Sequence, residues 1–124
     1  MPITVRDAHY PGRAPIDAYG NGGFRFAGMS HRGSLLCLPS GIHGWKEPAL
    51  DEAGLAAVFA EAEAIDVLLV GTGISLVPLP KALRESFRAS GIVAEPMSTG
   101  AAVRTFNVLL AEERAVAAAL IAVT

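Results

Sequence analysis

Apolar residues divide the chain into short segments, and the clearest lies near its middle. Residues 66–73 read Asp-Val-Leu-Leu-Val-Gly-Thr-Gly, in which four apolar residues follow one another without a polar interruption. Such a run is typical of a strand that is covered on both faces of a sheet. The small residues that follow allow the backbone to turn sharply and to expose its N–H groups. The pattern predicts an inner strand over residues 67–70 that ends in a tight turn.

The first third of the chain shows strand patterns. Residues 16–19 form one short candidate, and residues 23–29 alternate with period two, as in a half-buried strand. Residues 34–38 are nearly all apolar, and only a short polar segment separates them from the strand before. This spacing predicts an N-terminal antiparallel β-hairpin in which residues 30–33 form the turn. A further edge strand is expected at residues 3–5.

Helical periodicity begins after residue 50. Apolar residues recur at i, i+3, i+4 and i+7 within residues 52–64, which predicts an amphipathic helix with Asp51 as its N-cap. A second helix is expected to begin at about Pro80, because proline fits the first helical turn. Gly91 provides its C-terminal stop.

The order of elements in the last third predicts parallel strands. A strand over residues 92–95, ended by Pro96, is followed by a helix over residues 99–111 with Ser98 or Thr99 as its N-cap. Strand and helix alternate here, which favours parallel strands joined by right-handed crossovers.

The last segment, residues 115–123, is ambiguous from its pattern alone. Its alanines favour a helix, whereas its valine, leucine and isoleucine residues suit a buried strand.

Length and composition limit the number of domains and the type of protein. The 124 residues suit a single α/β domain over residues 1–124, with a loosely structured segment at residues 1–22. The chain is 52% apolar, with a mean hydropathy of +0.42. No apolar run approaches the roughly 18 residues needed to cross a bilayer, so membrane insertion is not expected. The apolar excess suits a covered sheet and some exposed apolar surface, such as a subunit interface.

Charge and special residues exclude several classes of function. The net charge is −2 and the ten basic residues are scattered, which argues against nucleic acid as a partner. Cys37 lies among leucines and is expected to be a small buried residue rather than a nucleophile. No signal peptide is visible, so the cytoplasm is the expected location.

No catalytic or metal-binding constellation stands out. The three histidines, His9, His31 and His43, have no second ligand at metal-binding spacing, so neither a metal nor a cofactor is expected. Ser40 and Ser75 do not lie in a Gly-x-Ser-x-Gly motif. No catalytic residue is therefore predicted. The sequence favours a protein that is not an enzyme, and an enzyme stays the open alternative.

Several segments together resemble a family of small single-domain proteins long catalogued as a domain of unknown function. Its eukaryotic members include a mitochondrial assembly factor for respiratory complex I and an adipogenesis-associated protein. The segments include Leu-Val-Gly-Thr-Gly, Glu-Pro-Met-Ser-Thr and Arg-Thr-Phe-Asn-Val-Leu, and the resemblance runs from about Gly22 onward. Members more often have tyrosine where Phe106 stands and glycine where Glu113 stands.

The resemblance implies a three-layer α/β/α fold with a mixed central sheet. It also implies that residues 115–122 form a central antiparallel strand, in which alanines let helices pack closely. Membership suggests roles in assembly or protein binding, and it brings no catalytic residues with it.

The candidate binding site lies where two predicted strands end. If the strands over residues 67–70 and 92–95 are parallel, their carboxyl ends share one edge of the sheet, where ligands collect. That edge would hold Gly71, Thr72 and Gly73 together with Met97, Ser98 and Thr99. The helix that begins there can stabilise a carboxylate or phosphate through its free N–H groups. The alternative is simple turn chemistry, because Gly-Thr-Gly lacks the lysine and the length of a Walker loop.

Four further residues can support this site. Arg104 and Asn107 share a helix face, where they bind a ligand or, as we favour, tie the helix to neighbouring loops. Glu95 is expected to pair with Arg104 rather than to act as a general base. Trp45 with Met97 can line an apolar pocket or anchor a partner, and ordinary core packing is the alternative.

Two functions follow from these observations. The preferred one is a protein-binding or assembly-assisting module that also self-associates. The alternative is a small-molecule or anion binder, or an enzyme, that uses the crevice at residues 71–73 and 97–99.

Overall fold

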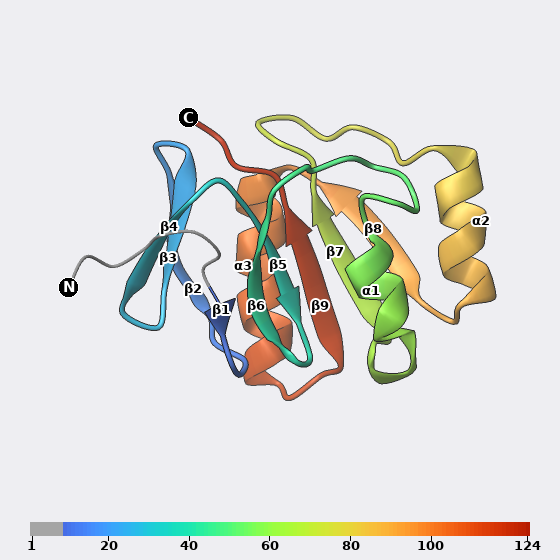
Figure 1. Cartoon of the computed structure of the whole chain (residues 1–124), viewed down its shortest axis with the longest axis horizontal. Coiled ribbons are helices and arrows are strands. Elements are labelled where there is room, and N and C mark those ends of the chain that lie inside the picture. The colour runs from blue at the N-terminus through green and yellow to red at the C-terminus, as the bar shows by residue number, and fades with distance from the viewer. Residues whose placement is uncertain (1–8) are drawn as a thin grey trace.

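A six-stranded mixed sheet forms the centre of the molecule in a computed structural model, which describes residues 9–124 (Figure 1). The strand expected at residues 3–5 lies outside the described residues. In spatial order the strands are β1 (His9–Tyr10), β6 (Gly41–Trp45), β5 (Ser34–Leu38), β9 (Val116–Leu120), β7 (Val67–Gly71) and β8 (Val93–Met97).

The last strand, β9, lies in the middle of this sheet. It pairs antiparallel with β5, where Ala119 faces Leu36, and parallel with β7, where Ala118 faces Leu69. All five of its residues are buried. The central strand implied by the family resemblance is thereby confirmed, and its antiparallel pairing is with β5 alone.

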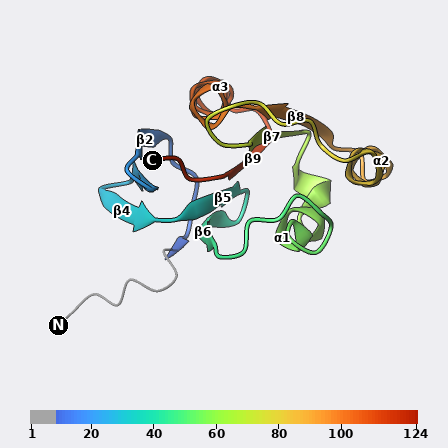
Figure 2. The same ribbon diagram turned by 90° about the horizontal axis from the view of Figure 1, so that it is seen from above.

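Helices cover both faces of the sheet, so the three-layer α/β/α arrangement is confirmed (Figure 2). Helix α3 (Thr99–Ala111) packs on one face, and α1 (Ala56–Ala60) and α2 (Lys81–Ala89) pack on the other. β7 contributes to both layers, since Leu69 lies in the α3 core while Leu68 and Val70 lie in the opposite core. An inner strand covered on both sides is what the apolar run predicts.

The helix predicted over residues 52–64 is much shorter in the structure. Only α1 is helical, and the three residues Ala62–Ala64 form a 3₁₀ turn. Asp51 does not cap α1: its Oδ1 accepts a hydrogen bond of 2.7 Å from the Gly54 N–H, which closes a separate turn. The apolar periodicity of residues 52–64 therefore includes segments that pack against the core but are not α-helical.

A second sheet of three antiparallel strands lies on the α3 side. It consists of β2 (Ile16–Gly20), β3 (Gly23–Phe26) and β4 (Met29–Arg32). The predicted pairing of residues 23–29 with residues 34–38 is wrong, because the chain turns already at Ala27 and Gly28, which have positive φ angles of 48° and 74°. This is the geometry of a two-residue hairpin turn. β5 instead pairs with β6 and β9.

β8 forms one edge of the six-stranded sheet and contains Pro96, which was expected to end it. The Val93 N–H donates to the Asp66 carbonyl, and the Met97 carbonyl accepts from the Thr72 N–H. Because backbone groups alternate in direction along a strand, Ala94 and Pro96 direct theirs away from β7. Proline is tolerated at such a position since the N–H it lacks would face outward.

Candidate functional site

The ends of β7 and β8 meet at one edge of the sheet. The two strands are parallel, with Gly71 opposite Met97, and the Thr72 N–H donates to the Met97 carbonyl over 2.8 Å. The structure thus brings Gly71, Thr72 and Gly73 next to Met97, Ser98 and Thr99. Whether this group binds a ligand stays a prediction.

Thr99 holds the strand ends together, and its side chain is fully buried. Its Oγ1 donates to the Ile121 carbonyl over 2.7 Å and accepts from the Gly73 N–H over 3.0 Å. Its own N–H donates to the Gly73 carbonyl over 2.8 Å. We call these three bonds the Thr99 clasp. A Cβ on Gly71 would lie 3.0 Å from Thr99 Oγ1, so glycine is needed there for close packing.

The other two hydroxyl groups of the candidate site are also engaged within the chain. Thr72 Oγ1 accepts from the Val77 N–H over 2.8 Å and donates to the Ser75 carbonyl over 2.8 Å. Ser98 caps α3 by accepting from the Ala101 N–H over 3.3 Å. The hydroxyls that sequence reasoning assigned to a ligand thus satisfy backbone groups, which favours the alternative of turn chemistry at these residues.

A small hollow of about 210 Å³ remains beside the clasp. Its lining includes Gly73, Ser98 and Arg104 from the predicted set. It also includes Tyr19 of β2, whose hydroxyl lies over Gly100. Sequence reasoning missed Tyr19, because nothing in the sequence indicates that β2 lies against the first turn of α3.

Trp45 does not join Met97, and this part of the prediction is wrong. The indole N–H donates to the Gly54 carbonyl over 2.8 Å, and the ring is buried in the core under α1 and α2. Met97 packs against the core on the α3 face. The sheet separates the two side chains, so ordinary core packing, the other alternative, describes Trp45.

The remaining supporting residues have structural or exposed positions. The Asn107 carboxamide pairs with the backbone of Ile16, accepting from its N–H over 2.8 Å and donating to its carbonyl over 2.9 Å. This pairing ties α3 to β2, which is the structural role that we favour for Asn107 from the sequence. Glu95 lies exposed on β8, and within residues 9–124 it forms no ion pair with Arg104, so that expectation is wrong.

The loop that follows the site exposes an apolar surface that sequence reasoning did not single out. Ile74, Leu76 and Val77 are 77%, 56% and 46% exposed, and we call them the 74–77 strap. The Thr72 hydroxyl bonds fix one end of the loop, and the buried Leu79 anchors the other. The signal was present in the run Ile-Ser-Leu-Val-Pro-Leu-Pro, which is apolar but interrupted by prolines.

Comparison with known proteins places this arrangement in a family. Residues 16–121 match the family model described as a protein of unknown function, DUF498/DUF598. The chain belongs to the DUF498/DUF598 family.

Relatives of this family member come from bacteria and from animals. The chain is 46% identical over 119 residues to an uncharacterised protein of Rhodobacter capsulatus, covering 96% of this chain and 93% of that one. It is 29% identical over 122 residues to NADH dehydrogenase [ubiquinone] 1 alpha subcomplex assembly factor 3 of Mus musculus, covering 96% of this chain. The matched region spans 66% of that mouse protein's length.

A solved structure of similar fold is the crystal structure of a Bartonella henselae protein described as an outer membrane protein. It superposes with a TM-score of 0.89 at 59% identity, covering 93% of this chain and 99% of that chain. Within residues 9–124 of the DUF498/DUF598 chain, no helix combines the length and the hydrophobicity required to cross a bilayer.

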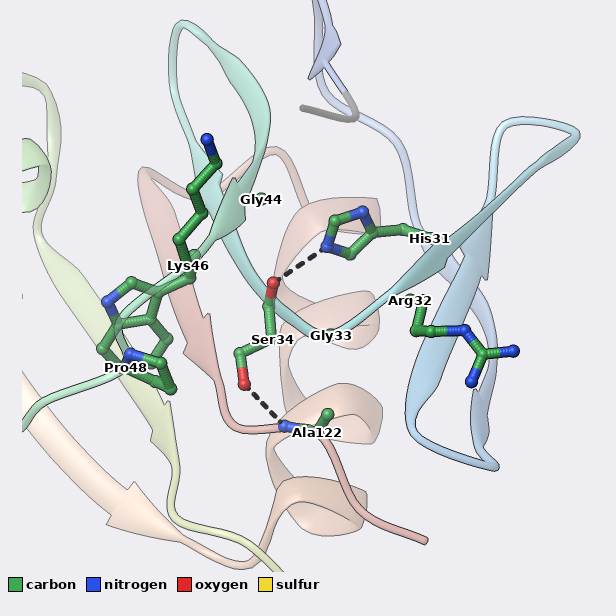
Figure 3. A pocket seen from close by; sticks show the side chains of 9 residues that line it. His31, Arg32, Gly33, Ser34, Gly44, Lys46, Pro48 and Ala122 are labelled. Carbon is green, nitrogen blue, oxygen red and sulfur yellow. Dashed lines mark hydrogen bonds between the residues drawn. The ribbon is translucent and has the colours of Figure 1, made fainter. Parts of the chain in front are cut away.

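A hollow of about 380 Å³ in this DUF498/DUF598 member lies beside β4 and β6 (Figure 3). The buried His31 donates from Nε2 to the Ser34 carbonyl over 3.1 Å, and Ser34 Oγ accepts from the Ala122 N–H over 2.9 Å. His31 Nδ1 is buried and has no hydrogen-bond partner in the described part of the chain. Figure 3 shows Arg32 and Lys46 pointing away from each other, so the basic side chains do not converge on one ligand position.

Proposed function

We propose that this family member is a protein-binding module that assists the assembly of a larger complex, and that the 74–77 strap is its contact surface. The observation that carries the proposal is the exposure of three large apolar side chains on one short loop. Contiguous exposed apolar surface is typical of sites where proteins bind one another. The similarity to a complex I assembly factor supports the same function for this chain.

The strap is suited to binding because its backbone is fixed before a partner arrives. Thr72 bonds two backbone groups of the loop, and Leu79 fills the core behind it. A loop that is already ordered loses little conformational entropy on binding, so more of the contact energy remains as affinity. Large apolar side chains at the centre of an interface contribute most of that energy.

The test replaces Ile74, Leu76 and Val77 by serine together. We expect the wild-type protein to retain a partner from native extract, or to form dimers, and the triple variant to elute as a monomer without a partner. Affinity purification followed by size-exclusion chromatography with light scattering measures both outcomes. Each apolar side chain that leaves an interface costs about 1.5–3 kcal/mol, so the loss of three should abolish binding.

A single-site control is Val108→Ser, which removes an apolar side chain of comparable exposure (57%) from the outer face of α3. This variant should bind like the wild type. The proposal is wrong if the wild-type protein is monomeric and retains no partner, or if the triple variant and the control retain the same partner equally.

A second candidate function uses the hollow beside the Thr99 clasp. The first turn of α3 and the exposed Arg104 both face this hollow, which favours an anion such as phosphate or a carboxylate. Inorganic phosphate that raises the melting temperature of the wild type but not of Arg104→Gln would favour this function. It ranks second because the site's hydroxyls already bond the protein's own backbone.

A further inference from the structure

A hollow of about 420 Å³ lies between α2 and the outer edge of β8, and positively charged side chains line it. Its walls are Arg84 and Arg88 of α2 and residues 91–94, which lead into β8. In Figure 1, α2 runs alongside β8 at one end of the sheet. The lining residues place the hollow toward the C-terminal part of this helix. No acidic residue is among the lining residues.

The two arginines belong to a mainly basic face of α2, on which Glu85 is the one acidic residue. Lys81, Arg84 and Arg88 stand at positions i, i+3 and i+7, so their side chains share one side of the helix. All three are exposed, while Leu83 and Phe87 on the other side are buried. Neither arginine forms an ion pair with a carboxylate within residues 9–124. Their charge is therefore available to a partner.

The edge of β8 offers unpaired backbone groups beside these charges. The N–H and carbonyl of Ala94 point away from β7, as the bonds of Val93 and Met97 to the β7 segment require. Glu95 projects toward the opposite face of the sheet from Ala94, since side chains alternate along a strand. The acidic residue of β8 is thus on the side away from the arginines.

We propose that this hollow binds a short extended peptide segment with acidic side chains on alternate residues. The segment adds to the sheet as a strand by pairing with Ala94, in the manner of strand addition to an exposed sheet edge. Alternate side chains of the added strand point to the α2 side, where their carboxylates bond the guanidinium groups of Arg84 and Arg88. Pro96 presents no outward N–H, so it limits the paired stretch to the first part of β8.

The test uses two synthetic peptides, acetylated and amidated at their ends. One is Val-Glu-Val-Glu-Val-Glu and the other replaces each glutamate by glutamine. In titrations of the full chain followed by ¹H–¹⁵N NMR, we expect the acidic peptide to shift the Ala94 amide signal and to slow its hydrogen exchange. The neutral peptide should bind at least about tenfold more weakly, because charge-assisted hydrogen bonds are lost.

Two variants separate the charges from the backbone pairing. Arg84→Gln with Arg88→Gln should weaken acidic peptide binding by about tenfold or more, since two charge-assisted bonds are lost. Ala94→Pro should abolish it, because this change removes only an outward N–H and no bond to β7. Arg25→Gln with Arg32→Gln, at exposed positions of β3 and β4, removes the same two charges away from the hollow and should bind normally.

Several outcomes of these titrations would overturn the proposal. These are equal binding of the acidic and neutral peptides, unchanged binding by the double arginine variant, and shifts confined to residues outside the hollow. Equally tight binding of polyphosphate would also overturn it, since it would show a general anion surface. If Ala94→Pro does not fold, the arginine variant still decides. The serine variant of the 74–77 strap should bind the peptide normally, so failure here is distinct from failure of the proposed function.

Discussion

Thr99 shows how one side chain fixes the geometry of the strand ends. Its hydroxyl serves one buried donor, the Gly73 N–H, and one acceptor, the Ile121 carbonyl. These groups belong to the segments that follow β7 and β9, so one oxygen atom joins two neighbouring strands to the start of α3. Buried backbone groups need such partners because water does not reach them.

We predict that Thr99→Val, which keeps the shape but removes the hydroxyl, lowers the free energy of unfolding by about 3 kcal/mol. The reason is that each buried polar group left without a partner costs about 1–3 kcal/mol. Urea denaturation followed by circular dichroism measures the change. Thr99→Ser keeps the hydroxyl and should lose only about 1 kcal/mol for the missing methyl group. Equal stability of the two variants would contradict the role of the clasp.

The meeting of the two strand ends was predictable at this scale, but the hydrogen-bond partners of their hydroxyl groups were not. Parallel strands require that Thr72, Ser98 and Thr99 gather at one edge, and the sequence pattern was sufficient for that. The groups that occupy their hydroxyls, such as the Ser75 and Ile121 carbonyls, lie in segments whose path the pattern does not reveal. Trp45 was placed wrongly because its face of the sheet depends on how β6 pairs.

At the level of elements, the small sheet is attached to the main body partly through α3. The Asn107 carboxamide forms two hydrogen bonds with the backbone of Ile16, the first residue of β2. Ile16 is itself buried, in the same core as Phe106. The attachment therefore combines a polar pairing with apolar packing, at positions 91 residues apart in the chain.

We predict that Asn107→Ala lowers the free energy of unfolding by about 2 kcal/mol, because both backbone groups of Ile16 lose their partners. Amide hydrogen exchange should become faster in β2 while the exchange of β7 and β9 changes less. Mass spectrometry of deuterium uptake measures this difference. Val108→Ala, on the exposed side of the same helix, is the control and should change little. Uniform acceleration across all strands would show that Asn107 has no local role.

Elements with strong periodicity and clear end signals were predicted well. The predicted helix over residues 99–111 has the same bounds as α3, and α2 lies between Pro80 and Gly91 as expected. β4 was missed because Ser30, His31 and Arg32 are polar, and its one buried side chain is a histidine. The mainly basic face of α2 could be read from the predicted helix, since Lys81, Arg84 and Arg88 stand at positions i, i+3 and i+7. It was missed because the basic residues were judged as scattered along the chain.

On the scale of the whole molecule, the central sheet separates two apolar cores. Cys37 of β5 lies in the core on the α3 side and is 2% exposed. Burial raises the pKa of the Cys37 thiol well above its usual range, since the charged thiolate would lose its hydration. The folded protein thus keeps this thiol protonated, as expected of a small buried residue.

This burial predicts how stability depends on pH. Below the usual thiol pKa of about 8.5, Cys37 is protonated in both the folded and the unfolded chain, so its contribution to the free energy of unfolding is fully present. Above it only the unfolded chain ionises at this residue, so stability falls by about 1.4 kcal/mol per pH unit until the raised folded pKa is reached. Urea denaturation at pH 7.5 and 9.5 should therefore show a smaller loss for Cys37→Ala than for the wild type. The same loss in both proteins would contradict this account.

The layered architecture as a whole was predictable only with the family resemblance. The pattern alone left residues 115–123 open between helix and strand, and this choice decides whether β5 and β7 share a neighbour. Five buried residues with three consecutive alanines carry no distinct period, because both faces of β9 are covered.

The position of β9 also sets the order in which the protein can be completed during synthesis. β5 and β7 are synthesised before β9. The backbone groups on the facing edges of β5 and β7 stay unpaired until β9 lies between the two strands. A nascent chain that has not reached Leu120 therefore holds two apolar strands with open edges, the kind of surface on which misfolded chains associate. A chain stalled ahead of β9 would therefore present the edges of β5 and β7 to other chains.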